Sequence, residues 1–244
     1  VAASSDLVPV AAGQAVTGKD ASLTVGGAVS GHVTDQSNNP LRVCVGAAPV
    51  GGGAGPSTAT NANGDDTLTR LPPGATTVRF YSCGNGAGVF DSGATTTISR
   101  AATNTINASL ELTSSISGHL TSSSGGAIPG LCVSAKSSAT GSYITNTNAS
   151  GDYAIPSLHA GNYKLSFADC SYFNGGLQPP PYTLEWWNDK PSEAAADSVA
   201  VAQGQNVTAI NAELQAIPAA NDPVEAPVIA GGTVSTDPAR TGPT

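Results

Sequence analysis

Positive charge is scarce in this chain of 244 residues. Nine Lys and Arg stand against 17 Asp and Glu, which gives a formal net charge of -8. Proteins bind nucleic acid and anionic membrane surfaces by neutralising phosphates with basic side chains. The composition therefore argues against both classes of partner.

Long apolar runs, methionine and most aromatic side chains are missing as well. No stretch of about 18 apolar residues occurs, so we expect no segment that spans a membrane. Methionine is absent and aromatic residues make up 5% of the chain. Hydrophobic residues nevertheless reach 39% and charged residues only 11%, which is not the balance of a disordered acidic tail. We therefore expect a folded protein whose cores contain few aromatic side chains.

Motifs for catalysis and for metals are also lacking. No CxxC, HExxH or serine-elbow motif occurs, and the three histidines (His32, His119 and His159) form no triad with a carboxylate. The segments NANGDD (61–66) and NASGD (148–152) carry oxygen ligands of the kind that calcium prefers, but both lack the terminal Glu of a calcium loop. We interpret them as hairpin turns, in which Asn and Gly reach positive φ. We expect no enzyme, no cofactor and no metal site.

The four cysteines form two pairs with nearly equal spacing. Cys44 precedes Cys83 by 39 residues, and Cys132 precedes Cys170 by 38. Since neither zinc nor redox motifs accompany them, we predict two disulfides. Disulfides persist in oxidising compartments, so we expect an extracellular, secreted or cell-surface location.

An internal repeat defines the organisation of the chain. The segment AVSGHVTDQSNNPLRVCVGA (28–47) aligns with SISGHLTSSSGGAIPGLCVSA (115–135), and NANGDDTLTRLPPGATTVRF (61–80) aligns with NASGDYAIPSLHAGNYKLSF (148–167). Fixed-period self-similarity is the signature of tandem modules. We predict module one at residues 25–113 and module two at residues 114–216.

The first residues repeat the end of module two. Residues 1–23 align without gaps with residues 192–214, at 11 identical positions. We therefore interpret residues 1–24 as the closing strands of a preceding repeat, in a processed or excised piece of a longer tandem array. The alternative is a donor strand that completes a module of another subunit. Residues 217–244, rich in Pro, Gly and Ala, are predicted to be a tail or linker.

Both modules show a β pattern throughout. Short β-prone runs such as SISGHLTS, LCVSAK and NYKLSFAD alternate with period two, and turn residues such as SSGG and HAGN separate them. About seven strands in roughly 90–100 residues indicate a two-sheet sandwich. We predict an all-β protein of two tandem Ig-like antiparallel β-sandwiches, each with one intradomain disulfide.

Module two resembles a known family in its glycine, proline and tyrosine positions. These are Gly118, Pro129, Gly151, Tyr153, Gly161 and Tyr163, and they resemble the pattern of carboxypeptidase regulatory-like, prealbumin-like sandwich domains and their Cna-B-related relatives. Module one departs from that pattern, with Asp66 and Thr76 in place of the two tyrosines. The resemblance implies a prealbumin-like sandwich that serves as a spacer, stalk or accessory module of secreted bacterial proteins, adhesins or virion appendages. Fold similarity alone does not establish function.

Cna-B-related domains often carry a Lys–Asn isopeptide bond. Here His32 and His119 stand in the first strands where the resemblance would place the lysine. We therefore expect no isopeptide bond, and we expect the cystines to hold the modules together instead.

Alternation along the strands predicts where the cystines lie. Cys132 shares a face with Ser134 and Lys136, and Cys170 falls with Lys164 and Ser166. Both cysteines are therefore predicted on the polar faces of their strands. We expect each disulfide to join neighbouring strands of one sheet, near its end, rather than to cross the core.

The only tryptophans, Trp186 and Trp187, are adjacent in the segment TLEWWNDKPS. Adjacent residues of a strand point to opposite faces. By alternation with Tyr182 and Leu184, we assign Trp186 to the interior and Trp187 to the outer face. There it would contact a neighbouring module, the QPPP turn (178–181) or a ligand.

The leading hypothesis is an extracellular structural repeat segment: a stalk, spacer or filament subunit of a surface or appendage protein. Its partners would be neighbouring modules or subunits of the same protein. One alternative is an adhesin module that binds a glycan or a host or cell-surface protein through Trp187, Tyr172 and Phe173. Another is an accessory domain of a secreted hydrolase.

Overall fold

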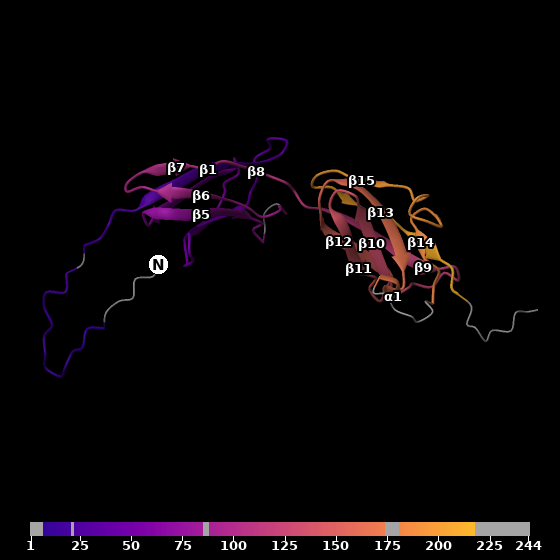
Figure 1. The fold of residues 1–244 in the computed structure, drawn as a ribbon, viewed down its shortest axis with the longest axis horizontal. Helices are drawn as coiled ribbons and strands as arrows, with labels where there is room; N and C mark the ends of the chain where they lie inside the picture. Colours follow the sequence, from indigo (N-terminus) through magenta and orange to yellow (C-terminus); the bar gives the residue numbers. More distant parts are fainter. Residues whose placement is uncertain (1–6, 21, 85–87, 174–180, 218–244) are drawn as a thin grey trace, which may run out of the picture.

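The computed structural model describes residues 7–20, 22–84, 88–173 and 181–217. Within these ranges the chain forms two β-sandwiches that follow one another along the long axis of the molecule (Figure 1). A single turn of helix, α1 (Cys170–Phe173), lies in the second sandwich. In the described ranges no helix is long and apolar enough to cross a membrane. The predicted all-β class is confirmed.

The first sandwich consists of two sheets. One has the order β4-β1-β7, with β8 also paired to β1, and the other has the order β3-β2-β5-β6. The strands are β1 (Gly27–Asp35), β2 (Cys44–Pro49), β3 (Ser57–Ala59), β4 (Asp65–Leu71), β5 (Gly74–Tyr81), β6 (Ser92–Ile98), β7 (Thr103–Thr105) and β8 (Ala108–Leu110).

The second sandwich repeats this plan. One sheet has the order β12-β9-β16, with β17 also paired to β9, and the other has the order β11-β10-β13-β14, with β15 also paired to β13. The strands are β9 (Ser114–Ser122), β10 (Cys132–Ser137), β11 (Gly141–Asn146), β12 (Asp152–Leu158), β13 (Gly161–Ala168), β14 (Glu185–Trp186), β15 (Val199–Val201), β16 (Asn206–Val207) and β17 (Ala212–Leu214).

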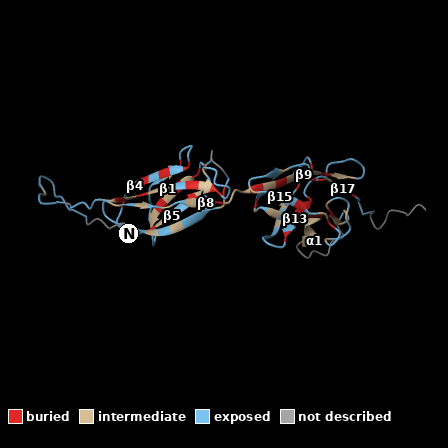
Figure 2. Cartoon of the chain, turned by 90° about the horizontal axis from the view of Figure 1, so that it is seen from above, coloured by how far each residue is buried: buried red, intermediate tan, exposed pale blue. Residues whose placement is uncertain are grey.

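Each sandwich encloses its own apolar core. Buried and exposed residues alternate along the strands, so that one face of each sheet meets the other sheet (Figure 2). Val29, Val33 and Phe80 lie in the first core, which otherwise contains aliphatic side chains. The second core adds the rings of Tyr163 and Phe167, both fully buried. The two sandwiches that we name module one and module two are thus independently cored, while the exact boundaries at 25–113 and 114–216 stay predictions.

The NANGDD and NASGD segments form tight turns between strands. The Asn61 side chain accepts hydrogen bonds from the backbone N–H groups of Asn63 and Asp65, at 2.8 and 2.9 Å, and Asn148 makes the equivalent pair. Gly64 and Gly151 follow with φ of 83° and 81°. These side-chain oxygens are occupied by backbone donors, which supports a turn over a calcium loop. The turns are not hairpins, because they connect β3 to β4 and β11 to β12, which lie in different sheets, and only their glycines have positive φ.

The last strands of each sandwich pair in parallel with its first strand. In module one, β7 and β8 run parallel to β1, with Asp35 opposite Leu110. In module two, β16 and β17 run parallel to β9, with Ser122 opposite Leu214. The other pairings are antiparallel. The chain therefore enters each sandwich at one end and leaves it at the other.

The N-terminal segment forms no strand in the residues described. Residues 7–20 and 22–25 run outside both sandwiches, as the indigo trace in Figure 1 shows. The roles foreseen for residues 1–24, as closing strands or as a donor strand, stay predictions. Residues 1–6, and the predicted tail beyond Ile217, lie outside the described ranges.

Candidate functional site

Each sandwich contains one cystine, and the pairing of the four cysteines is the predicted one. Cys44 is bonded to Cys83, and Cys132 to Cys170, with Cα–Cα distances of 5.2 and 4.9 Å. No free cysteine remains among the described residues.

Each cystine joins neighbouring strands of one sheet near its end, as the alternation pattern predicts. Cys132 on β10 is opposite Ala168 on β13, and Cys170 follows two residues later in α1. Cys44 on β2 is opposite Tyr81, the last residue of β5, two positions before Cys83. The bridges therefore cross between adjacent strand ends and leave the cores free for apolar side chains.

The structure reverses the assignment of the two tryptophans. Trp186 lies opposite Ser166 of β13, on the outer face of the sheet, although it is only 8% exposed there, whereas the partly buried Trp187 packs against the core of module two. The alternation from Tyr182 fails because β14 comprises only Glu185 and Trp186, so the residues before it do not follow strand geometry. Glu185, opposite the core residue Phe167, points inward instead.

A hollow lies on the outer face of module two, where four strands contribute one residue each to a single row. The register places Ile144, Ser134, Ser166 and Trp186 side by side across β11, β10, β13 and β14. The two serines, 5% and 3% exposed, lie between larger apolar side chains. The resulting hollow has a volume of about 260 Å³.

Two aromatic residues of α1 and one ion pair complete this hollow. Tyr172 and Phe173 meet edge to face with ring centroids 5.3 Å apart, and Tyr172 is 56% exposed. Lys136 Nζ lies 2.8 Å from Glu193 Oε2 at the same hollow. Of the predicted contact residues, the structure thus brings Tyr172 and Phe173 together with Trp186, while Trp187 lines a separate surface depression beside His119 and Glu213. The serines and Ile144 carry no sequence signal, because only the cross-strand register reveals the row.

The inward position of Glu185 changes its acidity. Burial raises the pKa of the Glu185 carboxyl to about 7, and the negative charges of Asp189 and Glu213 add to the rise. Its Oε1 atom is buried and accepts no hydrogen bond in the described part of the chain. Just beyond it, Trp186 and Lys190 exchange two backbone hydrogen bonds of 2.9 Å across a tight turn, in which Asn188 and Asp189 have positive φ.

The histidines of the first strands pair with carboxylates. His32 Nδ1 lies 2.9 Å from Asp65 Oδ1, and His119 Nδ1 lies 2.8 Å from Asp152 Oδ1. These are isolated pairs on the surface, at equivalent places in the two modules. Within the described ranges, no group of three or more His, Cys, Asp or Glu is placed to hold a metal ion.

A buried carboxyl marks the departure of module one from the family pattern. In module two the Tyr153 hydroxyl donates a 2.7 Å hydrogen bond to the Ile210 carbonyl. Asp66 occupies the equivalent position in module one, where it is 6% exposed and neither oxygen has a hydrogen-bond partner among the residues described. Burial raises the pKa of Asp66, and the charge of Asp65 raises it further.

The junction between the modules is short, and its residues make contacts with both modules. Glu111, Leu112 and Thr113 connect β8 to β9. The Phe90 N–H donates to the Glu111 carbonyl at 3.0 Å, and the Thr113 N–H donates to the Gly88 carbonyl at 2.9 Å. The connecting residues are therefore paired to module one.

Side chains then join module one to module two across this junction. The rings of Phe90 and His159 stack with centroids 3.8 Å apart and planes within 5°. His159 Nδ1 lies 2.9 Å from Glu111 Oε2, and the Ala160 N–H donates to Glu111 Oε1 at 3.3 Å. The Gln203 side chain also donates to the Leu110 carbonyl, at 3.3 Å. This set of contacts favours one relative orientation of the sandwiches.

The family resemblance of module two is confirmed by comparison with known families. Residues 115–172 match the carboxypeptidase regulatory-like domain. The matched segment contains both tyrosines, Tyr153 and Tyr163, that Asp66 and Thr76 replace in module one. No protein of curated function matches the chain in sequence.

Solved structures that match the chain include two pilins and one further bacterial protein. The minor pilin GBS52 of Streptococcus agalactiae is 11% identical, with 80% of this chain and 98% of that chain covered and a TM-score of 0.38. The shaft pilin spaA of Lactobacillus rhamnosus GG is 12% identical, with 82% and 100% covered and a TM-score of 0.34. The Bacillus anthracis TIE protein is 12% identical, with 79% of this chain covered but only 34% of that chain, and a TM-score of 0.34. At these identities and scores, the roles of those proteins do not transfer to this chain.

Proposed function

We propose that this chain is an extracellular structural segment, a stalk, spacer or filament subunit, with no catalytic role. The observation that carries the proposal is the pairing of the strands through which the chain enters and leaves each sandwich. Because β1 is parallel to β8, and β9 is parallel to β17, a pull on the two ends of a sandwich moves these neighbours past one another. The hydrogen bonds between them are then loaded together, in shear, rather than opened one at a time.

The cystines and the junction support the same role. Each cystine closes a segment that cannot extend when its sandwich unfolds. The stack of Phe90 on His159 and the contacts of Glu111 align the two sandwiches in series. A surface poor in positive charge and paired cysteines accord with a location outside the cytosol. Neighbouring modules or subunits of the same protein are the partners proposed for such a segment.

The proposal predicts that resistance to force depends on the direction of pulling. In single-molecule force spectroscopy, module two pulled from the two ends of the chain is expected to unfold at high force, because β9 and β17 are sheared. In the matched geometry, force is applied between Ser124, in the exposed turn after β9, and the chain end after β17. These two points lie at the same end of the β9–β17 pair, so the pull separates the strands there and breaks their hydrogen bonds one after another. We expect a substantially lower unfolding force in that geometry. Equal forces in the two geometries would contradict the load-bearing role.

A second candidate function is recognition of a neutral ligand, such as a sugar ring, in the hollow on module two. Aromatic side chains stack on apolar faces while serine hydroxyls supply hydrogen bonds, and the hollow combines Tyr172 and Phe173 with Ser134 and Ser166. In this candidate site the tryptophan beside Tyr172 and Phe173 is Trp186, and not Trp187 as the sequence predicts.

Binding by the hollow can be tested on a glycan array with variants that spare the core. Tyr172→Ala and Ile144→Ser alter side chains that are 56% and 52% exposed. If the hollow binds glycan, each is expected to weaken binding about tenfold, or 1.4 kcal/mol, without changing Tm. Val50→Ala, at an exposed site of module one, is the control. Absence of any bound glycan, or equal loss with Val50→Ala, would remove this candidate.

A further inference from the structure

The N-terminal segment exposes a series of apolar side chains. Outside both sandwiches, Leu7, Val8, Val10, Leu23 and Val25 are 45–95% exposed. Figure 2 shows this segment almost entirely in the colour of exposed residues. Single exposed apolar residues are ordinary in soluble proteins, but their alternation along one segment is that of a strand with one buried face.

In module two the equivalent positions are buried. Residues 1–23 align with residues 192–214, so that Val8, Val10 and Leu23 correspond to Val199, Val201 and Leu214. Those three side chains are 5%, 4% and 0% exposed and belong to the core of module two. The apolar pattern of the N-terminal segment therefore matches one that closes a sandwich.

The backbone of the segment matches as well. The Gln14 N–H donates to the Ala11 carbonyl at 3.0 Å, and the Ala11 N–H donates to Gln14 Oε1 at 3.3 Å. Gln205 and Ala202 exchange the same two hydrogen bonds in module two, at 3.0 and 2.8 Å. The turn is thus formed in the N-terminal segment without a sandwich to support it.

Positive backbone angles occur at the same places in both segments. Gly13 and Gly204 have φ of 80° and 70°, and Gly18 and Ala209 have φ of 71° and 61°. Ala209 adopts this costly conformation where the chain passes between β16 and β17. The two segments therefore share one turn and the positions of these two positive angles.

We propose that residues 8–23 are the closing strands of a further sandwich of the same type, whose remaining strands lie outside the two sandwiches described here. In module two this path pairs antiparallel with β13 and then parallel with β9, and so closes both sheets. The acceptor is neither module of this chain nor a second copy, because β7 and β8 in module one, and β15 to β17 in module two, already occupy those positions. The inference goes beyond the load-bearing role and does not depend on it.

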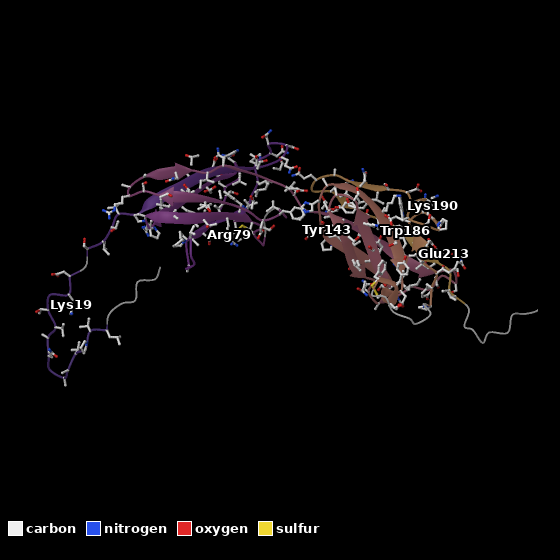
Figure 3. All side chains as sticks on the ribbon, viewed as in Figure 1. Lys19, Arg79, Tyr143, Trp186, Lys190 and Glu213 are labelled. Atoms are coloured by element: carbon white, nitrogen blue, oxygen red, sulfur yellow. A yellow bond between two sulfur atoms is a disulfide. The ribbon has the colours of Figure 1, made fainter. Side chains whose placement is uncertain are left out.

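One residue of the segment discriminates between acceptors. Lys19 stands where module two has Ile210, which is 6% exposed in the core. Figure 3 shows Lys19 on the N-terminal segment, away from both sandwiches. A lysine buried in an apolar core without a partner is strongly unfavourable. The acceptor must therefore offer Lys19 solvent or a carboxylate, which disfavours exchange with the closing strands of module two.

A chimera of the full chain tests the proposal. Residues 199–214 are replaced by a copy of residues 8–23, with Ile retained at position 210. If residues 8–23 are closing strands, module two is expected to fold, with a second thermal transition and with protected amides in β9 and β13 by hydrogen exchange. The matched control carries Asp at positions 199 and 201 of the same chimera, and its module two is expected to be unfolded.

Hydrogen exchange and thermal melting of the chimeras distinguish the proposal from its alternatives. A chimera whose β9 and β13 amides exchange as fast as those of the Asp control would overturn the proposal. A second chimera that keeps the lysine of the copied segment at position 210 is expected to melt about 10 °C or more below the first, since a domain of this size shifts several degrees per kcal/mol. Equal melting of the two chimeras would overturn the assignment of Lys19 as the discriminating residue. Neither result depends on the response of the chain to force.

Discussion

Removal of the Cys132–Cys170 cystine, by the double substitution Cys132→Ala and Cys170→Ala, is expected to lower the free energy of unfolding of module two by about 3–4 kcal/mol. The bridge spans 38 residues, and closing a loop of that length restricts the unfolded chain by about this amount in the chain-entropy model. For a domain of about 100 residues the loss corresponds to a fall in Tm of roughly 15–25 °C. Calorimetry of the full chain would measure it, because each module has its own core.

The unaltered module one serves as the internal control for this prediction. Its transition is expected to keep its Tm, since Cys44 and Cys83 are bonded to one another and lie in the other core. Force spectroscopy supplies an independent readout: without the bridge, module two is expected to extend by about a further 130 Å on unfolding, at roughly 3.4 Å per released residue. A loss below about 1 kcal/mol, or an unchanged extension, would show that the bridge does not restrict module two.

A single methyl group at Gly118 is expected to destabilise module two by about 3 kcal/mol. A Cβ on this residue of β9 would overlap the Ile210 carbonyl oxygen and would lie 3.0 Å from the ring of Tyr153. The segment around Ile210, between β16 and β17, would have to move away from β9. This movement stretches two hydrogen bonds: the 2.7 Å bond from the Tyr153 hydroxyl to the Ile210 carbonyl, and the 3.1 Å bond from the Ile210 N–H to the Ser117 carbonyl. Overpacking and a weakened buried hydrogen bond together account for the magnitude.

Gly126→Ala is the matched control for Gly118→Ala. Gly126 lies in the same module at a φ that any residue adopts, and the nearest atom to its Cβ would be Ser122 Oγ at 3.5 Å. Urea unfolding of the two variants is expected to give an unchanged midpoint for Gly126→Ala and a clearly lower one for Gly118→Ala. Similar midpoints would mean that the closing segment adapts to the methyl group, and that its close approach to β9 contributes little.

The two modules carry the same glycine but different neighbours. Gly31 of module one also packs against a carbonyl, that of Ile106, yet its second neighbour is a carboxylate oxygen of Asp66, at 3.0 Å from a Cβ placed there. The tyrosine that would reach this carbonyl is replaced by an acid whose side-chain oxygens have no hydrogen-bond partner in the part of the chain that the structure describes. Module one therefore preserves the path of the closing strands without the side-chain contact that ties them down in module two.

Much of the fold can be predicted from the sequence because its determinants are local or repeated. Alternating side chains indicate strands, an Asn followed by a Gly indicates the turns at Gly64 and Gly151, where the Gly has positive φ, and the duplicated spacing pairs the four cysteines. Alternation also predicts a bridge between neighbouring strands, but Cys83 and Cys170 lie beyond the ends of β5 and β13, where alternation assigns no face. These features depend on neighbours within a few residues, or on a comparison of one half of the chain with the other.

The candidate site could be predicted only in part, for a reason that Trp186 illustrates. Alternation assigns a face only while the chain stays in a strand, and β14 is two residues long. The face of Trp186 is decided by its pairing with Ser166, a residue 20 positions earlier in the chain. The hollow beside it needs four strands in register, and no property of Ile144 or Ser134 alone indicates that they share a row.

By itself, the sequence determined that this protein is built from duplicated, cystine-bridged β modules, and that residues 1–23 repeat the sequence of residues 192–214. Only the tertiary structure decided the parallel pairing of the last strands with the first, the Phe90–His159 contact at the junction and the outward position of Trp186. The physical reason is the range of the interactions. Turn and strand preferences act between near neighbours, whereas register and contact between sheets arise from the packing of residues far apart in the chain.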